Sequence, residues 1–275
     1  MEKQIIFNNQ PVNYRTQGSG PWVVLLHGFL ESLEIWSDLA NNLSDKFSLL
    51  MIDLPGHGRS GLADDIQTIP LMAAAVRAVM ASAGVDEFVL CGHSMGGYIS
   101  LEIAREVPDK TKGLILFHSH AAPDDEKSKE NRNRTINVVK LNHANYIHSF
   151  IPDLFAQSNK EKLADRIERL RNRAASTSGK AIIAALTAMR DREGAFDVIM
   201  NSTFPICFII GKDDTRMSYE KIVAQTMLAN HAEILMLSNV GHMGILEAPD
   251  ITFPFIKSFC ERYLIKEIKS QGLAD

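Results

Sequence analysis

The sequence has 275 residues, of which 45% are hydrophobic and 23% charged, and 29 basic against 33 acidic residues give a formal net charge of −4. This balance is typical of a globular protein, and it shows no basic excess that would indicate nucleic acid or an anionic membrane as a partner. The length suits one large α/β domain, or a core domain with an insertion.

The cysteines and the first residues indicate a compartment. Three cysteines, Cys91, Cys207 and Cys260, cannot all pair within one chain, and the absence of a disulfide framework favours a reducing environment. The opening residues Met1-Glu2-Lys3-Gln4 lack the apolar segment of a secretory signal. No uncharged apolar run approaches the roughly 18 residues of a membrane span. We therefore expect a cytoplasmic protein without a membrane partner.

Apolar runs of strand length alternate with helical patterns along most of the chain. The run at 22–26 is continuously apolar, as expected of a strand buried on both faces. The Asn-Asn-Gln-Pro sequence at 8–11 predicts a hairpin turn between the first two strands. The expected strands are 3–8, 12–16, 22–26, 47–52, 88–91, 113–117, 204–210 and 233–237, and the expected helices outside the insertion are 31–42, 69–83, 95–107, 217–229 and 251–263.

The alternation stops after Ser119, and only helical patterns follow until the strands resume. Within this stretch, helices are expected at 161–174 and 180–190, and the mixed charges at 124–134 are typical of a solvated helix face. The pattern predicts a mostly parallel sheet of about eight strands with helices on both faces. It divides into a core of residues 1–120 and 202–275, and a helical cap at 121–201 inserted after the sixth strand.

The sequence Gly92-His93-Ser94-Met95-Gly96 lies between an expected strand and an expected helix. This context is the one that a nucleophile elbow requires, in which the serine adopts a strained positive φ at a sharp turn. Such a turn closes only if the residues two before and two after the serine lack bulk, and both are glycine. The alternative is a glycine-rich turn with an incidental serine.

A serine hydroxyl needs a base, and His242 follows the strand at 233–237 through a short loop. That loop lies at the same carboxyl edge of a parallel sheet as Ser94, although a surface-loop histidine remains the alternative. The histidine in turn needs a carboxylate, and the loop after the strand at 204–210 offers both Asp213 and Asp214. The carboxylate not used is expected to be a helix N-cap or a solvated charge.

Further residues are expected around this constellation. The backbone N–H groups of Phe29 and Met95 are expected to form the oxyanion hole. His118 and His120 follow the strand at 113–117 and are expected to contact substrate, as pocket-lining polar groups. No further ligands at defined spacing indicate a metal site. Two cap residues, Tyr146 and Phe150, are expected as lid contacts to substrate.

Five motifs together resemble the α/β-hydrolase fold superfamily, in its capped serine hydrolase branch. They are His27-Gly28-Phe29, Asp53-Leu54-Pro55-Gly56-His57-Gly58-Arg59-Ser60, Gly92-His93-Ser94-Met95-Gly96-Gly97, Gly211-Lys212-Asp213-Asp214 and Gly241-His242-Met243. Their order is the order of that superfamily: nucleophile, acid, histidine. The resemblance covers nearly the whole chain and implies that Asp214, three residues after the glycine, is the acid.

The resemblance implies a serine hydrolase that cleaves a small to medium carboxylic ester, lactone or thioester through an acyl-serine intermediate. Its catalytic residues are expected to be Ser94, Asp214 and His242, its partners a small acyl substrate and water, and no cofactor or metal is required. Three alternatives use the same scaffold: a C–C bond hydrolase, a cofactor-free peroxidase-like enzyme and a non-catalytic ligand-binding protein. No feature of the sequence indicates an oligomeric state.

Overall fold

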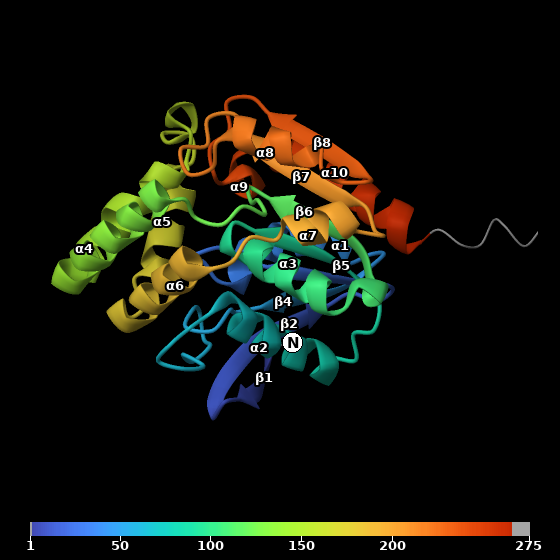
Figure 1. Cartoon of the computed structure of the whole chain (residues 1–275), viewed down its shortest axis with the longest axis horizontal. Coiled ribbons are helices and arrows are strands. Elements are labelled where there is room, and N and C mark those ends of the chain that lie inside the picture. The colour runs from blue at the N-terminus through green and yellow to red at the C-terminus, as the bar shows by residue number, and fades with distance from the viewer. Residues whose placement is uncertain (1, 266–275) are drawn as a thin grey trace, which may run out of the picture.

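The computed structural model describes residues 2–265, and its centre is one eight-stranded sheet with helices on both faces (Figure 1). The strand order is β1-β2-β4-β3-β5-β6-β7-β8, and from β4 to β8 all neighbours are parallel. The expected mostly parallel sheet is therefore confirmed. The strands are β1 (Glu2–Phe7), β2 (Gln10–Gln17), β3 (Trp22–Leu26), β4 (Ser48–Ile52), β5 (Phe88–His93), β6 (Thr111–Phe117), β7 (Ile206–Gly211) and β8 (Ala232–Leu237).

Local sequence explains the hairpin at one edge of the sheet and the burial of its central strands. β1 and β2 form the antiparallel hairpin, and its turn residues Asn8 and Asn9 have φ values of 47° and 58°. Asparagine tolerates this left-handed region better than most residues, and two successive positive φ values match the twist of a tight hairpin. At the centre, Val24 of β3 pairs with Leu50 on one side and Leu90 on the other, and all three are fully buried.

The strand order reverses at β3, because the chain crosses to β4 on one side and then returns to β5 on the other. A crevice forms at the carboxyl ends of the strands at such a switch point, and ligands of α/β proteins bind there. The loop after β3 and the turn after β5 meet at this position. They contain Phe29 and Ser94 respectively.

Helices cover the sheet on both faces. α1 contacts α10 behind the sheet in Figure 1, and α2 contacts α3 in front of it. The helix expected at 31–42 begins later, as a 3-10 turn, because Ser32 is extended with φ −149°. The core helices are α1 (Ser37–Leu43), α2 (Ile69–Ser82), α3 (Met95–Glu106), α8 (Tyr219–Thr226), α9 (Gly244–Glu247) and α10 (Pro249–Leu264), and the 3-10 turns are Leu33–Trp36, Pro108–Lys110, Pro152–Leu154 and Gln157–Asn159.

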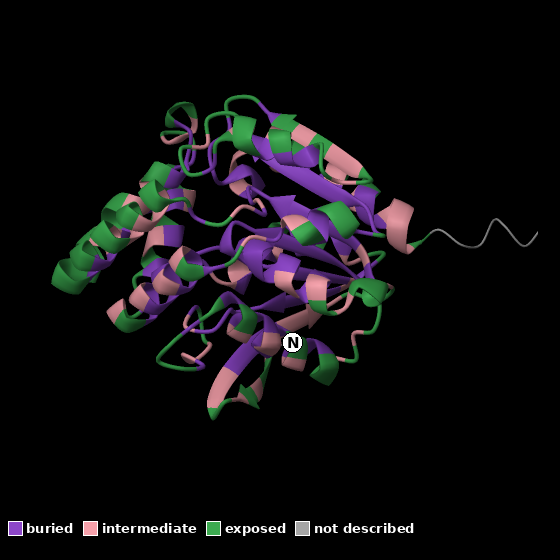
Figure 2. Ribbon diagram, in the orientation of Figure 1, coloured by how far each residue is buried: buried purple, intermediate pink, exposed green. Residues whose placement is uncertain are grey.

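The segment between β6 and β7 is helical, as expected, and α4, α5 and α6 project beyond the sheet (Figure 1). The outer surface of α4 is exposed, while the central strands of the sheet are buried (Figure 2). α4 is kinked at Asn142, whose side chain accepts a hydrogen bond from the Asn145 N–H and restarts the helix. The cap helices are α4 (Glu126–Phe150), α5 (Ala164–Ala174), α6 (Gly179–Asp191) and α7 (Phe196–Asn201).

α7 lies in the sequence range assigned to the cap but packs on α3 of the core. The division of the chain into 1–120 with 202–275, and 121–201, stays a prediction. Among residues 2–265, no helix combines the length and the apolar character needed to cross a membrane.

Candidate active site

Ser94 lies on the sharp turn between β5 and α3, with φ 49° and ψ −114°. Its carbonyl oxygen accepts a hydrogen bond of 2.8 Å from the Ser119 hydroxyl, which holds the turn against the end of β6. Close backbone approaches require glycine on both sides. A Cβ at Gly96 would lie 2.2 Å from the Leu26 carbonyl oxygen, and a Cβ at Gly92 would lie 2.4 Å from the Gly96 carbonyl oxygen. The strained backbone of Ser94 is thus fixed by its surroundings.

Asp214 and His242 are joined by a hydrogen bond of 2.7 Å between Oδ2 and Nδ1. Because the carboxylate can only accept, Nδ1 of His242 carries the proton and Nε2 keeps its lone pair. The other oxygen of Asp214 accepts from the backbone N–H groups of Arg216 and Met217. Burial opposes ionisation of Asp214, but the neighbouring His242 and His118 hold the pKa of its carboxyl well below its usual range. Asp213 is exposed and does not contact His242.

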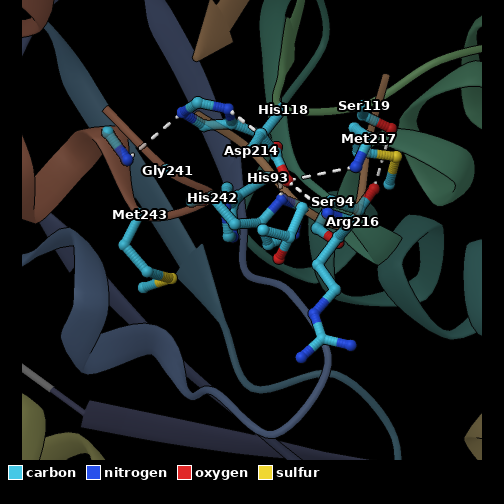
Figure 3. Close-up of polar contacts among 12 residues, drawn as sticks. His93, Ser94, His118, Ser119, Asp214, Arg216, Met217, Gly241, His242 and Met243 are labelled. Carbon is cyan, nitrogen blue, oxygen red and sulfur yellow. Dashed lines mark hydrogen bonds and ion pairs between the residues drawn. The ribbon is translucent and has the colours of Figure 1, made fainter. Parts of the chain in front are cut away.

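Ser94 and His242 line the same cavity, of about 280 Å³, beneath the cap (Figure 3). Within residues 2–265, no hydrogen bond joins the Ser94 hydroxyl to His242. Such contacts are often long in unliganded enzymes and shorten when substrate binds. The backbone N–H groups of Phe29 and Met95 likewise have no acceptor in the described part of the chain. They are free to donate to a ligand.

His118 is not among the residues that line this cavity, contrary to the expected substrate contact. It is fully buried below Asp214, with φ 47°, and its Nε2 accepts a hydrogen bond of 3.2 Å from the Gly244 N–H. Its Nδ1 therefore carries the proton and lies 3.3 Å from Asp214 Oδ2, too poorly aligned for a hydrogen bond. Burial lowers the pKa of His118 to about 4, so the ring is neutral. The neutral His118 ring therefore packs against the Asp214 carboxylate from the interior of the protein.

Asp214, His118 and His242 are the three ligand-type residues whose donor atoms lie within 4.8 Å of one another in the described chain. Their arrangement suits hydrogen bonding better than metal binding. The Nδ1 atoms of both histidines carry protons, and both face the same carboxylate oxygen. A metal ligand requires a free lone pair directed at the ion, which neither Nδ1 atom offers.

His93, beside the nucleophile, belongs to a buried ion pair that the sequence pattern did not reveal. Its Nδ1 lies 3.0 Å from a Glu31 carboxylate oxygen, and its Nε2 lies 2.8 Å from the His242 carbonyl oxygen. Since both neighbours are acceptors, both ring nitrogens donate and the ring is an imidazolium. Burial opposes both charges, but each partner offsets this: the pKa of His93 is raised and the pKa of Glu31 is lowered. Glu31 also accepts a hydrogen bond of 2.7 Å from the Gly28 N–H, next to Phe29.

The loop of His242 is tied to the cap. The His242 N–H donates a hydrogen bond of 2.7 Å to the Leu154 carbonyl oxygen. One oxygen of Glu247 accepts from the Gly241 N–H, and the other accepts from the Ala156 N–H. Glu247 therefore clamps the histidine loop to the segment that follows α4.

Three of the four expected substrate contacts, His120, Tyr146 and Phe150, line the cavity. Burial, together with the charge of Arg192, lowers the pKa of His120 to about 4, so this ring is a neutral polar group. The cavity is also lined by Phe29, Tyr98, Asp124, Ser128, Asn131, Arg132, Thr135, Leu186, Met189, Thr215, Arg216 and Met217.

Two arginines of this lining were not expected. Arg132 lies in the charged stretch 124–134, which we expected to be a solvated helix face, yet it faces the cavity because α4 runs across the cap. Arg216 follows Asp214 by two residues, so the rule that sites form at the carboxyl edge of the sheet could have found it. The orientation of α4 depends on tertiary packing, and no local pattern encodes it.

Comparison with known proteins identifies the family to which this chain is similar. A family model described as alpha/beta hydrolase fold matches residues 21–249. The (E)-2-((N-methylformamido)methylene)succinate hydrolase of Acinetobacter baylyi is 27% identical over 88% of this chain and 91% of that protein, and the pimeloyl-[acyl-carrier protein] methyl ester esterase of Stenotrophomonas maltophilia is 27% identical over 85% and 90%.

Among solved structures, a thermophilic esterase from Thermogutta terrifontis with malate bound has a TM-score of 0.89 at 25% identity, covering 96% of this chain and 99% of that one. The enol-lactonase from Burkholderia xenovorans has the same fold, with a TM-score of 0.86 at 19% identity over 94% of this chain and 99% of that one. The matched residues 21–249 include the serine turn, the Asp214 loop and the His242 loop. The chain therefore belongs to the alpha/beta hydrolase fold family, and it is a hydrolase.

Proposed function

We propose that this hydrolase cleaves a small to medium carboxylic ester, lactone or thioester through an acyl-serine intermediate. Ser94 is the nucleophile, His242 the general base and acid, and Asp214 the residue that orients His242. The N–H groups of Phe29 and Met95 form the oxyanion hole.

One observation carries this proposal. A serine with φ 49° lines the same cavity as a histidine whose Nδ1 is hydrogen bonded to a buried carboxylate. This bond fixes the tautomer in which Nε2 can accept a proton, and the negative charge of Asp214 stabilises the imidazolium that results. The two N–H groups without an acceptor at Phe29 and Met95 provide the donors that a developing oxyanion requires.

The proposed steps follow from these positions. Ser94 Oγ attacks the carbonyl carbon while His242 Nε2 takes its proton, and the carbonyl oxygen becomes an oxyanion bound by the two N–H groups. His242 then gives the proton to the leaving alkoxide or thiolate. Water enters, loses a proton to His242, and attacks the acyl-serine. His242 then gives this proton to Ser94 Oγ as the bond between Oγ and the acyl carbon breaks, which releases the carboxylic acid and restores both residues.

The cavity and the relatives support a small substrate. A volume of about 280 Å³ lies at the lower end of ligand pockets, which span roughly 300–1,000 Å³. Of two relatives of similar length, one is named as an esterase of the methyl ester of pimeloyl-[acyl-carrier protein], and the other as a hydrolase of a small succinate derivative. The first name supports ester hydrolysis, and the second, like the volume of the cavity, supports a small substrate.

The test is active-site labelling with a fluorophosphonate probe, followed by mapping of the labelled peptide. Wild type should be labelled at Ser94, and labelling should disappear in Ser94→Ala and in His242→Ala. Ser94→Ala should also lower kcat on a methyl or p-nitrophenyl ester by at least on the order of a thousandfold. A folded wild type that is neither labelled nor able to release acid from any ester of a graded panel would contradict the proposal and favour a non-catalytic ligand-binding protein.

A further inference from the structure

The charged side chains around the cavity do not balance. Arg132 and Arg216 both line it, and Asp124 is the acidic residue among the lining side chains that faces them. Asp124 is already shared, because one of its oxygens accepts from Arg132 Nε and the other from Arg192 Nη1. Asp214 is engaged by His242. The guanidinium groups of Arg132 and Arg192 therefore share the single carboxylate of Asp124. Arg216 adds a third positive charge that this carboxylate does not neutralise.

Arg216 is held next to the reacting centre without a strong partner. Its backbone N–H donates to Asp214, and its guanidinium points away from that carboxylate (Figure 3). The nearest carboxylate oxygen is that of Asp153, 3.9 Å away on an exposed side chain, and a pair of this kind contributes little. The guanidinium carbon instead lies 4.7 Å from the centre of the Phe150 ring, a cation–π contact that fixes its position.

Phe150 connects this charge to the part of the cavity that Phe29 lines. Its ring centre is 5.6 Å from that of Phe29, whose backbone N–H is the proposed oxyanion donor, and 5.2 Å from that of Tyr146. The Phe150 ring thus contacts both the Arg216 guanidinium and the Phe29 ring. Because Arg216 and Ser94 line the same cavity, a group bound at Arg216 would share it with a carbonyl carbon attacked by Ser94.

Other donors around the cavity are also without partners. In residues 2–265 neither terminal nitrogen of Arg132 donates a hydrogen bond, and the Tyr146 hydroxyl makes none. Tyr146 is partly buried, and this burial raises the pKa of its hydroxyl, so it stays a neutral donor. Guanidinium groups bind carboxylates through two parallel hydrogen bonds, and a nearby hydroxyl can add a third.

We infer that the substrate carries a carboxylate close to the bond that is cleaved, and that Arg216 binds it, with Arg132 and Tyr146 as further donors. The substrate class is then a half-ester of a short dicarboxylic acid, or a lactone that bears a carboxylate. This inference rests on the proposed ester hydrolysis at Ser94 and names its substrate class.

Two esters of equal chain length test it: monomethyl glutarate, which ends in a carboxylate, and methyl valerate, which ends in a methyl group. Wild type should have a kcat/KM about 10- to 100-fold higher for monomethyl glutarate, because a hydrogen-bonded charge pair in a partly buried site has about this effect. In Arg216→Gln the ratio should fall toward one, and in Arg216→Glu it should invert.

Arg77→Gln is the matched control. Arg77 is a partly exposed arginine of α2, and it is paired with Glu106 at the end of α3 that is remote from Ser94. The substitution removes the same net charge and should keep the wild-type ratio. The ratio should also fall when salt is raised, because screening weakens a partly exposed charge pair. Equal rates on the two esters in wild type, or a ratio that Arg216→Gln leaves unchanged, would overturn the inference while leaving ester hydrolysis intact.

If wild type cleaves neither ester, the proposed function fails and binding decides the inference separately. Calorimetry with Ser94→Ala protein should then detect binding of monomethyl glutarate and not of methyl valerate, and Arg216→Gln in the same background should abolish the difference. Equal binding of both esters, or of neither, would overturn the carboxylate site.

Discussion

Asp214 is the residue at which most polar contacts of the site meet. His242 and two backbone N–H groups donate to it, and His118 lies against it from the interior. Neighbouring Asp213 is exposed and lacks these contacts. From the residues alone either carboxylate could have been the partner of His242, and only the spacing of the family motif favoured Asp214.

Asp214→Asn should lower kcat by on the order of ten thousandfold, because an amide in this position no longer fixes the productive tautomer of His242 or stabilises its charged form. Asp213→Asn is the matched control and should stay within about twofold of wild type. Steady-state kinetics on one ester measures both. An equal loss in the two variants would mean that the loop as a whole, and not the Asp214 carboxylate, is required.

The buried ion pair of Glu31 and His93 leads to a prediction about the free energy of unfolding and its dependence on pH. Its partners are 62 positions apart in sequence, and no local pattern pairs them, so only packing reveals the ion pair. The lowered pKa of Glu31 gives stabilisation that is present above its ordinary value of 4.5 and lost as the pH falls through the folded value. The raised pKa of His93 gives stabilisation that is complete below 6.5 and lost as the pH rises through the folded value.

Glu31→Gln should therefore lower the free energy of unfolding by about 3 kcal/mol, since it leaves a buried imidazolium without its counter-charge. The difference from wild type should be largest between pH 4.5 and 6.5 and should shrink at higher pH. Glu34→Gln, which alters a half-exposed carboxylate, should cost less than about 1 kcal/mol. Urea unfolding across this pH range measures both, and a pH-independent difference would contradict the ion pair.

Among the elements, the turn from β5 to α3 was the one best predicted from sequence. Its glycines, its serine and the flanking strand and helix are all contiguous, so local rules suffice. The helix predicted from Glu31 begins two positions later, with the 3-10 turn at Leu33, and α1 itself begins only at Ser37, because the side chain of Glu31 is engaged with Gly28 and His93 and not with a helix. The helix α4, kinked at Asn142, was not predicted at its full length because its mixed polar sequence has no clear periodicity.

Gly96→Ala should destabilise the protein by about 3 kcal/mol and abolish labelling of Ser94, because the new methyl group would lie 2.2 Å from the backbone oxygen of Leu26. Gly179, in the first turn of α6, is the matched control. Its nearest neighbour is a His143 side-chain atom at 3.5 Å, so Gly179→Ala should leave stability unchanged or raise it by up to about 1 kcal/mol. Thermal unfolding compares them, and a stable, active Gly96→Ala protein would contradict the proposed tightness of the turn.

In the whole molecule, both the cap and the core contact the loop of His242, the proposed catalytic base. The two oxygens of Glu247 bind different segments: Oε1 accepts from the histidine loop, and Oε2 accepts from the Ala156 N–H and from Asn159 in the cap.

Glu247→Gln has only one acceptor oxygen, so it can keep the hydrogen bonds to the histidine loop or those to the cap, but not both. It should therefore displace the loop and lower kcat by about 10- to 100-fold. Glu220→Gln, an exposed residue on α8, should have no effect. Kinetics with both variants checks this, and an unchanged kcat in Glu247→Gln would show that the clamp does not position His242.

The alternation of strands and helices was enough to predict the fold, and the fold predicts the edge of the sheet at which Ser94, Asp214 and His242 meet. Of the cap, the sequence predicted only that it is a helical insertion. Where α4 directs Arg132, and how Phe150 positions Arg216, depend on contacts between distant segments. These contacts determine which substrate fits, so substrate class was the least predictable property.

The hydrogen bond from the His242 N–H to the Leu154 carbonyl oxygen limits how the two parts can be recombined. In a chimaera joined at the ends of β6 and β7, a foreign cap would replace the acceptor of the histidine backbone and the groups bound by Glu247. Such a hybrid would lose its catalytic geometry along with its old selectivity. An exchange that retains residues 151–159 and replaces only the surrounding helices would place a new pocket over an undisturbed His242 loop.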